Sequence, residues 1–201
     1  MPDTIRTFIA FKLPKNIISS IREIQNGFKS YAFNARWLNP ENIHLTLKFL
    51  GDINYTDIEK VSETIINAVN SHPPVSLGVK GTGVFPGIKH PRVIWVGLTG
   101  QIEKLVGIQD DIEKNLEKLG FPREKRPFRG HLTLGRIKGK IDPKKLLDVM
   151  KNFEKFESEL FIADKIFLFK SDLKSTGSVY TELMGKRLSG LSGKLVEQGN
   201  R

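Results

Sequence analysis

Apolar residues recur along this chain with two different periods, which alternate through most of its length. Spacing of three to four residues predicts four helices: one after Pro14, one from Thr56, one over 101–119 and one from Asp142. Two of these helices have recognisable first turns, since Thr56 and Glu59 form a capping-box pattern and Pro143 follows Asp142. The pattern therefore predicts four amphipathic helices separated by other structure.

Strand-like segments lie between and after these helices as short runs of apolar or alternating residues. They are predicted over 7–11, 44–50, 75–84, 92–98, 131–137, 159–169 and 180–183. Helices mixed with antiparallel strands indicate the α+β class, and we expect residues 1–201 to form one domain. The last stretch, 185–201, is rich in glycine, serine and lysine, which predicts a flexible tail.

One tetrapeptide, His-Leu-Thr-Leu, occurs twice, at His44–Leu47 and at His131–Leu134. The copies start 87 residues apart and contain two of the four histidines of the chain. At average residue frequencies, even one copy is expected in only about a few chains per thousand of this length. The repetition indicates an internal duplication, with one lobe around 44–47 and the other around 131–134, each contributing a strand to a shared centre.

The alternation of a strand explains the spacing inside each copy. Residues i and i+2 point to one face, so each histidine lies beside its threonine. Histidine exchanges protons near neutral pH, and two histidines on opposite sides of a phosphorus could divide an in-line displacement between a base and an acid. This makes His44 and His131 the candidate catalytic residues. Thr46 and Thr133 could then donate hydrogen bonds to non-bridging phosphate oxygens.

Basic residues on the same faces would strengthen phosphate binding. Lys48 is four residues after His44 and Arg129 is two residues before His131, so parity places both beside a histidine. Arg136 is five residues after His131 and would point away on an ideal strand. Only a bulge or the end of the strand would bring it back.

Charge points to an anionic partner. The formal net charge is +10, and residues 121–145 carry +7 of it, around the second motif. Such a stretch either attracts a polyanion or is merely a solvated basic face. RNA suits both the charge and the chemistry, because a 2′,3′-cyclic phosphate requires a 2′-hydroxyl.

Composition and motif searches exclude several kinds of functional site. The absence of cysteine excludes disulfides and thiolate metal sites, and no zinc-binding, phosphate-loop or dinucleotide fingerprint occurs. We therefore expect no metal and no cofactor. No apolar run of about 18 residues and no signal-peptide pattern are found, which predicts a cytoplasmic protein without membrane contact.

The sequence resembles the two-histidine phosphoesterases, specifically the RNA 2′,3′-cyclic phosphodiesterases that are also called 2′-5′ RNA ligases. The resemblance covers nearly the whole chain and lies in the segments RTFIAFKLP, RWLNPENIHLTLKFLGDI, GVFPGIKHPRVIWVGL and RPFRGHLTLGRIKG. It implies two pseudo-symmetric lobes of antiparallel sheet and helices around a central cleft.

The resemblance also implies an activity and roles for individual residues. The reaction would be metal-independent hydrolysis of a cyclic phosphate at an RNA end, such as the end of a tRNA fragment, to a 2′-phosphomonoester. His44 would donate a proton, His131 would accept one, and Arg136 would reach the cleft despite its parity.

Two other functions remain open from the sequence. The same site could act as a 2′-5′ RNA ligase if a sugar hydroxyl replaced water, or the chain could be a non-catalytic RNA-binding module. A monomer is expected.

Overall fold

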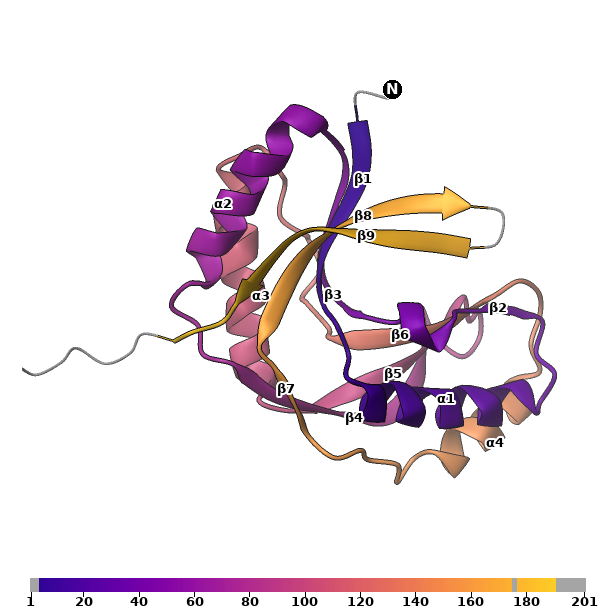
Figure 1. Ribbon diagram of the computed structural model, residues 1–201. Helices are drawn as coiled ribbons and strands as arrows, with labels where there is room; N and C mark the ends of the chain where they lie inside the picture. The colour runs from indigo at the N-terminus through magenta and orange to yellow at the C-terminus, as the bar shows by residue number, and fades with distance from the viewer. Residues whose placement is uncertain (1–3, 175–176, 191–201) are drawn as a thin grey trace, which may run out of the picture.

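Two antiparallel sheets and four α-helices make up the part of the chain that the computed structural model describes, residues 4–174 and 177–190 (Figure 1). This confirms the predicted α+β class and its two lobes. No helix in these residues is long and apolar enough to cross a membrane.

The first sheet has four strands in the order β3-β1-β8-β9. Their bounds are β1 Thr4–Phe11, β3 Leu45–Asn54, β8 Lys165–Lys174 and β9 Gly177–Arg187. Its central strand β1 is largely buried, because it receives β3 on one side and β8 on the other. The first His-Leu-Thr-Leu copy therefore lies at an edge of this sheet, at the start of β3.

The second sheet has five strands in the order β2-β6-β5-β4-β7. Their bounds are β2 Ala35–Trp37, β4 Val75–Phe85, β5 Val93–Gly100, β6 His131–Ile137 and β7 Phe161–Ala163. The second His-Leu-Thr-Leu copy begins β6, which is flanked by β5 and by the short strand β2. β3 and β6 approach each other across the two sheets.

When the chain is divided at the turn between β4 and β5, each sheet contains a central strand from the other half. β4 comes from the first half but pairs with β5, and β8 comes from the second half but pairs with β1. The three strands β3-β1-β8 of the first sheet thus combine two strands of the first half with one of the second. The three strands β6-β5-β4 of the second sheet combine two strands of the second half with one of the first, so each lobe needs both halves of the chain.

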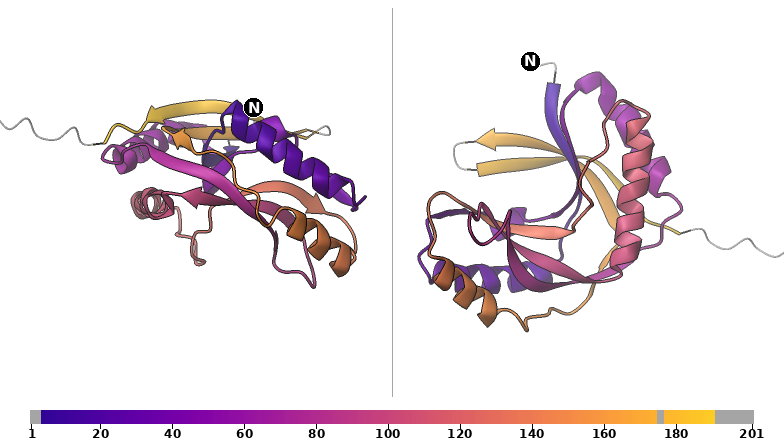
Figure 2. Two further views of the ribbon diagram at one scale, coloured as in Figure 1. Left: turned by 90° about the horizontal axis from the view of Figure 1, so that it is seen from below. Right: turned by 180° about the vertical axis from the view of Figure 1, so that it is seen from behind.

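The helices form as their apolar spacing predicts. They are α1 Lys15–Lys29, α2 Ile58–Val69, α3 Ile102–Glu117 and α4 Pro143–Asn152. The views of Figure 2 show α2 and α3 lying side by side, on a different edge of the molecule from α1 and α4. Asp142 caps α4 by accepting a hydrogen bond from the Lys144 amide at 2.9 Å, as its position before a proline predicts.

Several local features differ from the prediction. The strand expected over 159–169 is divided into β7 and β8, which belong to different sheets. The Thr56 capping box is wrong, because residues 55–57 form a 3₁₀ turn and α2 begins after it without a side-chain cap. Strand β2 is too short to leave a periodic signal. Residues 185–187 of the expected tail belong to β9, and Leu188 beyond them is buried. The rest of that expectation, 191–201, lies outside the described residues.

Candidate active site

Both His-Leu-Thr-Leu copies face one cleft of about 460 Å³ between the two sheets. His44 and Thr46 line it from the β3 side, and His131 and Thr133 line it from β6. The leucines between them, Leu45 and Leu132, are fully buried on the opposite faces. The alternation therefore does what the sequence predicts: it brings two imidazoles and two hydroxyls together and holds them by apolar packing behind.

The two imidazoles are oriented in the same way. His44 Nδ1 lies 2.9 Å from the carbonyl oxygen of Asn42, and His131 Nδ1 lies 2.7 Å from that of Arg129. A carbonyl oxygen only accepts, so each Nδ1 must carry a proton and donate it. Nε2 is then the nitrogen that each ring offers to a ligand.

Aromatic rings hold both imidazoles in place. The ring of Phe8 stacks on His44 with centroids 4.6 Å apart, and Tyr180 meets His44 edge-on at 5.1 Å. Phe85 meets His131 edge-on at 5.0 Å. Burial among these rings lowers the pKa of His44 below its ordinary value of 6.5, and the hydrogen bond to the Asn42 carbonyl only partly opposes this shift.

A bulge in β3 sends Lys48 away from the cleft, contrary to the expectation from parity. Ile9 pairs with Lys48 and Ala10 pairs with Thr46, so Leu47 is an extra residue in the ladder. The extra residue reverses which face the following side chains occupy. Phe49 therefore lines the cleft, and Lys48 points to the back of the sheet.

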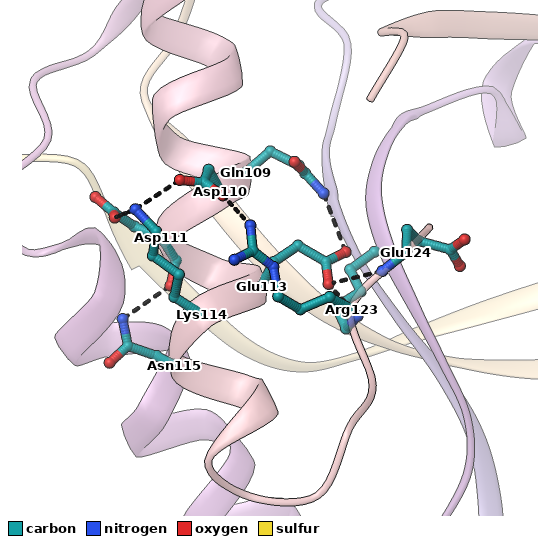
Figure 3. Close-up of polar contacts among 9 residues, drawn as sticks. Gln109, Asp110, Asp111, Glu113, Lys114, Asn115, Arg123 and Glu124 are labelled. Atoms are coloured by element: carbon teal, nitrogen blue, oxygen red, sulfur yellow. Dashed lines mark hydrogen bonds and ion pairs between the residues drawn. The ribbon is translucent and has the colours of Figure 1, made fainter. Parts of the chain in front are cut away.

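Lys48 instead forms a buried ion pair. Its side chain is 3% exposed, and Nζ donates to Glu113 Oε2 of α3 at 2.5 Å and to the carbonyl oxygen of Pro122 at 2.9 Å. The Glu113 carboxylate also accepts hydrogen bonds from Gln109 Nε2 at 3.0 Å and from the backbone amide of Glu124 at 3.3 Å. Figure 3 shows these residues around Glu113. Lys48 thus fixes the loop that leads to His131, and is not a phosphate ligand in this geometry.

A matching bulge in β6 brings Arg136 into the cleft. Ile94 pairs with Gly135 and Trp95 pairs with Thr133, so Leu134 is the extra residue. Leu134 is the fourth residue of the second motif, as Leu47 is of the first. Arg136 lines the cleft as a result, which meets the condition that the sequence set for it.

Arg129 does not contribute its side chain to the cleft. The side chain is exposed and is not part of the cleft wall, and only the backbone carbonyl acts, by holding His131. Part of the basic stretch is also neutralised, because Arg123 pairs with Asp110 of α3. Within segment 121–145, the charge of Arg123 is therefore already paired inside the fold.

Two further arginines, Arg6 of β1 and Arg36 of β2, line the cleft and were missed by the reasoning from motifs. Both stand in segments that carry the family resemblance, RTFIAFKLP and RWLNPENIHLTLKFLGDI, which was the available signal. In the part of the chain that the structure describes, the cleft wall carries no carboxylate, and no three His, Asp or Glu side chains gather closely enough to hold a metal ion. The cleft offers a ligand positive charge and hydroxyl donors.

A family model described as LigT-like phosphoesterase matches the chain twice in succession, over residues 11–95 and 96–180. Each match contains one His-Leu-Thr-Leu copy, so the duplication predicted from the repeated tetrapeptide is confirmed.

Relatives of known activity align over most of the chain. An RNA 2′,3′-cyclic phosphodiesterase of Methanocaldococcus jannaschii is 36% identical over 176 residues, covering 88% of this chain and 96% of that protein. Another, from Methanothermobacter thermautotrophicus, is 29% identical over 184 residues, covering 92% and 99%. A third, from Aquifex aeolicus, is 32% identical over 181 residues, covering 88% and 94%.

Solved structures share the fold. The protein TT0787 of Thermus thermophilus superimposes with a TM-score of 0.78 at 23% identity, over 93% of this chain and all of the other. E. coli LigT complexed with 3′-AMP superimposes with a TM-score of 0.70 at 21% identity, over 92% of this chain and 99% of the other.

The environment of His44 predicts an unusual titration. Burial disfavours its charged form, so in the free protein the pKa should lie below 6.5. An anion in the cleft should raise it, since a nearby negative charge favours imidazolium. NMR titration of labelled histidine, without and with inorganic phosphate, measures both effects against the urea-unfolded chain. A free-protein midpoint at or above 6.5 would contradict the burial argument.

The buried ion pair predicts a large loss of stability when one partner is neutralised. Glu113→Gln leaves the Lys48 ammonium buried without a counter-charge, which costs about 3–5 kcal/mol of unfolding free energy. Urea denaturation measures the loss. The matched control is Asp110→Asn on the same helix, whose ion pairs are partly exposed and should matter much less. A loss in Glu113→Gln no larger than that in Asp110→Asn would contradict the predicted cost of leaving Lys48 buried without a counter-charge.

Proposed function

This chain belongs to the LigT-like phosphoesterase family, and on that premise we propose that it hydrolyses 2′,3′-cyclic phosphates at RNA ends to 2′-phosphomonoesters. One observation carries the proposal: two matched His-x-Thr pairs from different sheets line a single positively charged cleft. The relatives whose printed activity is RNA 2′,3′-cyclic phosphodiesterase support the choice of substrate.

In the proposed reaction, water attacks phosphorus in line with the departing 3′-oxygen. His131 Nε2 accepts a proton from the water, and His44 Nε2 donates a proton to the 3′-oxygen as the P–O bond breaks. Thr46 and Thr133 donate hydrogen bonds to the non-bridging oxygens, where negative charge must be held. The phosphate stays on the 2′-oxygen, so one water is consumed and one monoester is formed.

The lowered pKa of His44 bears on this assignment. A proton donor must be protonated, yet burial lowers the pKa of His44 and so disfavours its protonated form in the free protein. The cyclic phosphodiester carries one negative charge, and binding it beside the imidazole favours the protonated form. Substrate binding would thus charge the donor at the moment when it is needed.

RNA fragments such as those of tRNA are proposed substrates, and the cysteine-free composition favours the cytoplasm as the location. We also propose that the chain acts as a monomer and folds as one domain. The pairing of β8 with β1 and of β4 with β5 supports the single domain.

The direct test is incubation with an oligoribonucleotide that ends in a 2′,3′-cyclic phosphate, in EDTA. The expected product gains one water and carries a 2′-phosphate, identified by mass and by end-specific phosphatase. EDTA should leave turnover unchanged, because acid, base and charge stabilisation all come from side chains. A 3′-phosphate product would reverse which oxygen leaves, a 2′-5′ joined product would indicate ligation, and binding without turnover would contradict the proposal.

The two histidines should differ in their dependence on the leaving group. His44→Ala and His131→Ala should each lose about 10²–10⁴-fold in turnover of the cyclic phosphate, with circular dichroism unchanged. A p-nitrophenyl phosphodiester of a nucleoside needs no proton on its leaving group. On that substrate His44→Ala should lose far less activity than His131→Ala. The opposite ranking would exchange the two roles, and full activity of either variant on the cyclic phosphate would refute the acid–base mechanism.

A further inference from the structure

A second pocket adjoins the cleft at His44. It has a volume of about 360 Å³ and shares Asn42, His44, Ser178 and Tyr180 with the cleft. A ligand longer than one nucleotide therefore has two routes out of the cleft, one through this pocket and one past the end of β6. The charges along the two routes distinguish them.

In the part of the chain that the structure describes, the second pocket offers a phosphate no free lysine or arginine. Its one such residue, Lys12, pairs with Glu182, which also lines the pocket. A further carboxylate of the lining, Glu41, pairs with Arg22 of α1. A phosphate on this route would have to compete with a carboxylate for each cation, so the route is unfavourable for a polyanion.

The route past the end of β6 begins with cations that have no partner. Val93, Arg136 and Arg36 are neighbours in one row across β5, β6 and β2, and all three line the cleft. Among residues 4–174 and 177–190, neither arginine takes part in an ion pair. This end of the cleft therefore carries a positive potential that attracts anions.

Lys138 continues the positive charge beyond the cleft. Its amide donates to the carbonyl oxygen of Asn34 at 2.8 Å, so the pairing of β2 with β6 extends one residue past the end of each strand. Residues i and i+2 of an extended strand share a face, which places Lys138 on the face of Arg136, roughly 7 Å further along. Lys138 is exposed, and no ion pair of the described residues includes it.

The turn after Lys138 adds a second lysine. Gly139 lies against β2, since a Cβ on it would stand 3.3 Å from Asn34 Nδ2. Lys140 follows it, is exposed and likewise takes part in no ion pair within the described ranges. The carboxylate nearest in sequence, that of Asp142, is engaged as the cap of α4. Both lysines are thus available to an anionic ligand, and we call them the exit lysines.

We propose that the RNA strand preceding the terminal nucleotide leaves the cleft past the end of β6, where the exit lysines contact its phosphates. This rests on the function proposed above and specifies its substrate: the end of an RNA strand several nucleotides long, in preference to a free nucleoside 2′,3′-cyclic phosphate. Arg136 stays with the cleft, and the lysines two and four residues beyond it meet the phosphates that precede the cyclic one. Phosphate contacts carry no sequence information, so the preference is for length and not for sequence.

The test compares kcat/KM for adenosine 2′,3′-cyclic phosphate with that for oligoadenylates of two, four and eight nucleotides that carry the same end. Efficiency should rise with length until the strand covers both exit lysines, and then level off. The decline of kcat/KM with salt should also be steeper for the tetramer than for the nucleoside, because each phosphate contact releases counterions.

The double variant Lys138→Gln/Lys140→Gln assigns this gain to the exit lysines. The ratio of kcat/KM between the tetramer and the nucleoside cyclic phosphate should fall roughly 10-fold at low salt. The logarithmic salt slope for the tetramer should become shallower by about 1.4, which is about 0.7 for each lost contact with a single strand. The matched control is Lys60→Gln/Lys104→Gln, which removes the same charge from exposed positions on α2 and α3, on a different edge of the molecule from α4 (Figure 2). It should keep the ratio of the unaltered protein.

The variant Lys12→Gln probes the route through the second pocket, and it should also keep the ratio. If Lys12→Gln lowers the ratio while the double variant keeps it, the strand leaves through the second pocket and the inference is refuted.

The remaining outcomes separate this inference from the proposed function. If the nucleoside cyclic phosphate is hydrolysed but efficiency does not rise with length, the exit lysines do not bind RNA and the hydrolase stands. If no substrate turns over, the proposed function fails, and fluorescence anisotropy with a labelled tetramer still tests the surface. Equal affinity of the double variant and the unaltered protein would refute the inference in that case as well.

Discussion

The site depends on one constraint of strand geometry, the alternation of side chains, and on one residue that breaks it in each half. Alternation aligns each histidine with its threonine. The extra residue that follows, Leu47 or Leu134, reverses the alternation for the side chains directly after it. Without the second bulge Arg136 would face the back of its sheet, and without the first Lys48 would face the cleft. The motif and the bulge together determine which chemistry reaches the ligand.

The same reversal ties the site to the stability of the fold. Because β3 turns Lys48 backward, its ammonium meets Glu113 of α3 and the carbonyl of Pro122, just ahead of the second motif. The strand that carries the first motif is thus hydrogen-bonded to the loop that precedes the second motif. The exchange of β4 and β8 between sheets has a similar effect on a larger scale, because neither half of the chain owns a complete sheet. The Lys48–Glu113 ion pair and the strands shared between the sheets both link the two walls of the cleft.

The sequence predicts the elements whose causes are local. Helix α1 follows from the spacing of its apolar residues, and the cap of α4 follows from Asp142 before a proline. Thr56 fails as a cap because it lies inside a 3₁₀ turn that precedes the helix. Strand β2 exists only because β6 lies beside it, and three residues carry no period of their own. The order of the strands is likewise decided by contacts between distant segments, which periodicity does not record.

The candidate site was also predictable only in part. His44, Thr46, His131 and Thr133 follow from alternation within one strand, but a bulge has no local sign in His-Leu-Thr-Leu, so parity alone places Lys48 wrongly.

The bulges also explain how a duplicated site becomes asymmetric. Phe49 and Arg136 both stand five residues after a motif histidine, and both are turned into the cleft. Phe49 offers an exposed aromatic ring, and Arg136 offers a positive charge. In addition, stacking on Phe8 buries His44 and lowers its pKa. A ligand in the cleft therefore meets two chemically different walls on one repeated backbone, an aromatic ring on one side and an arginine on the other.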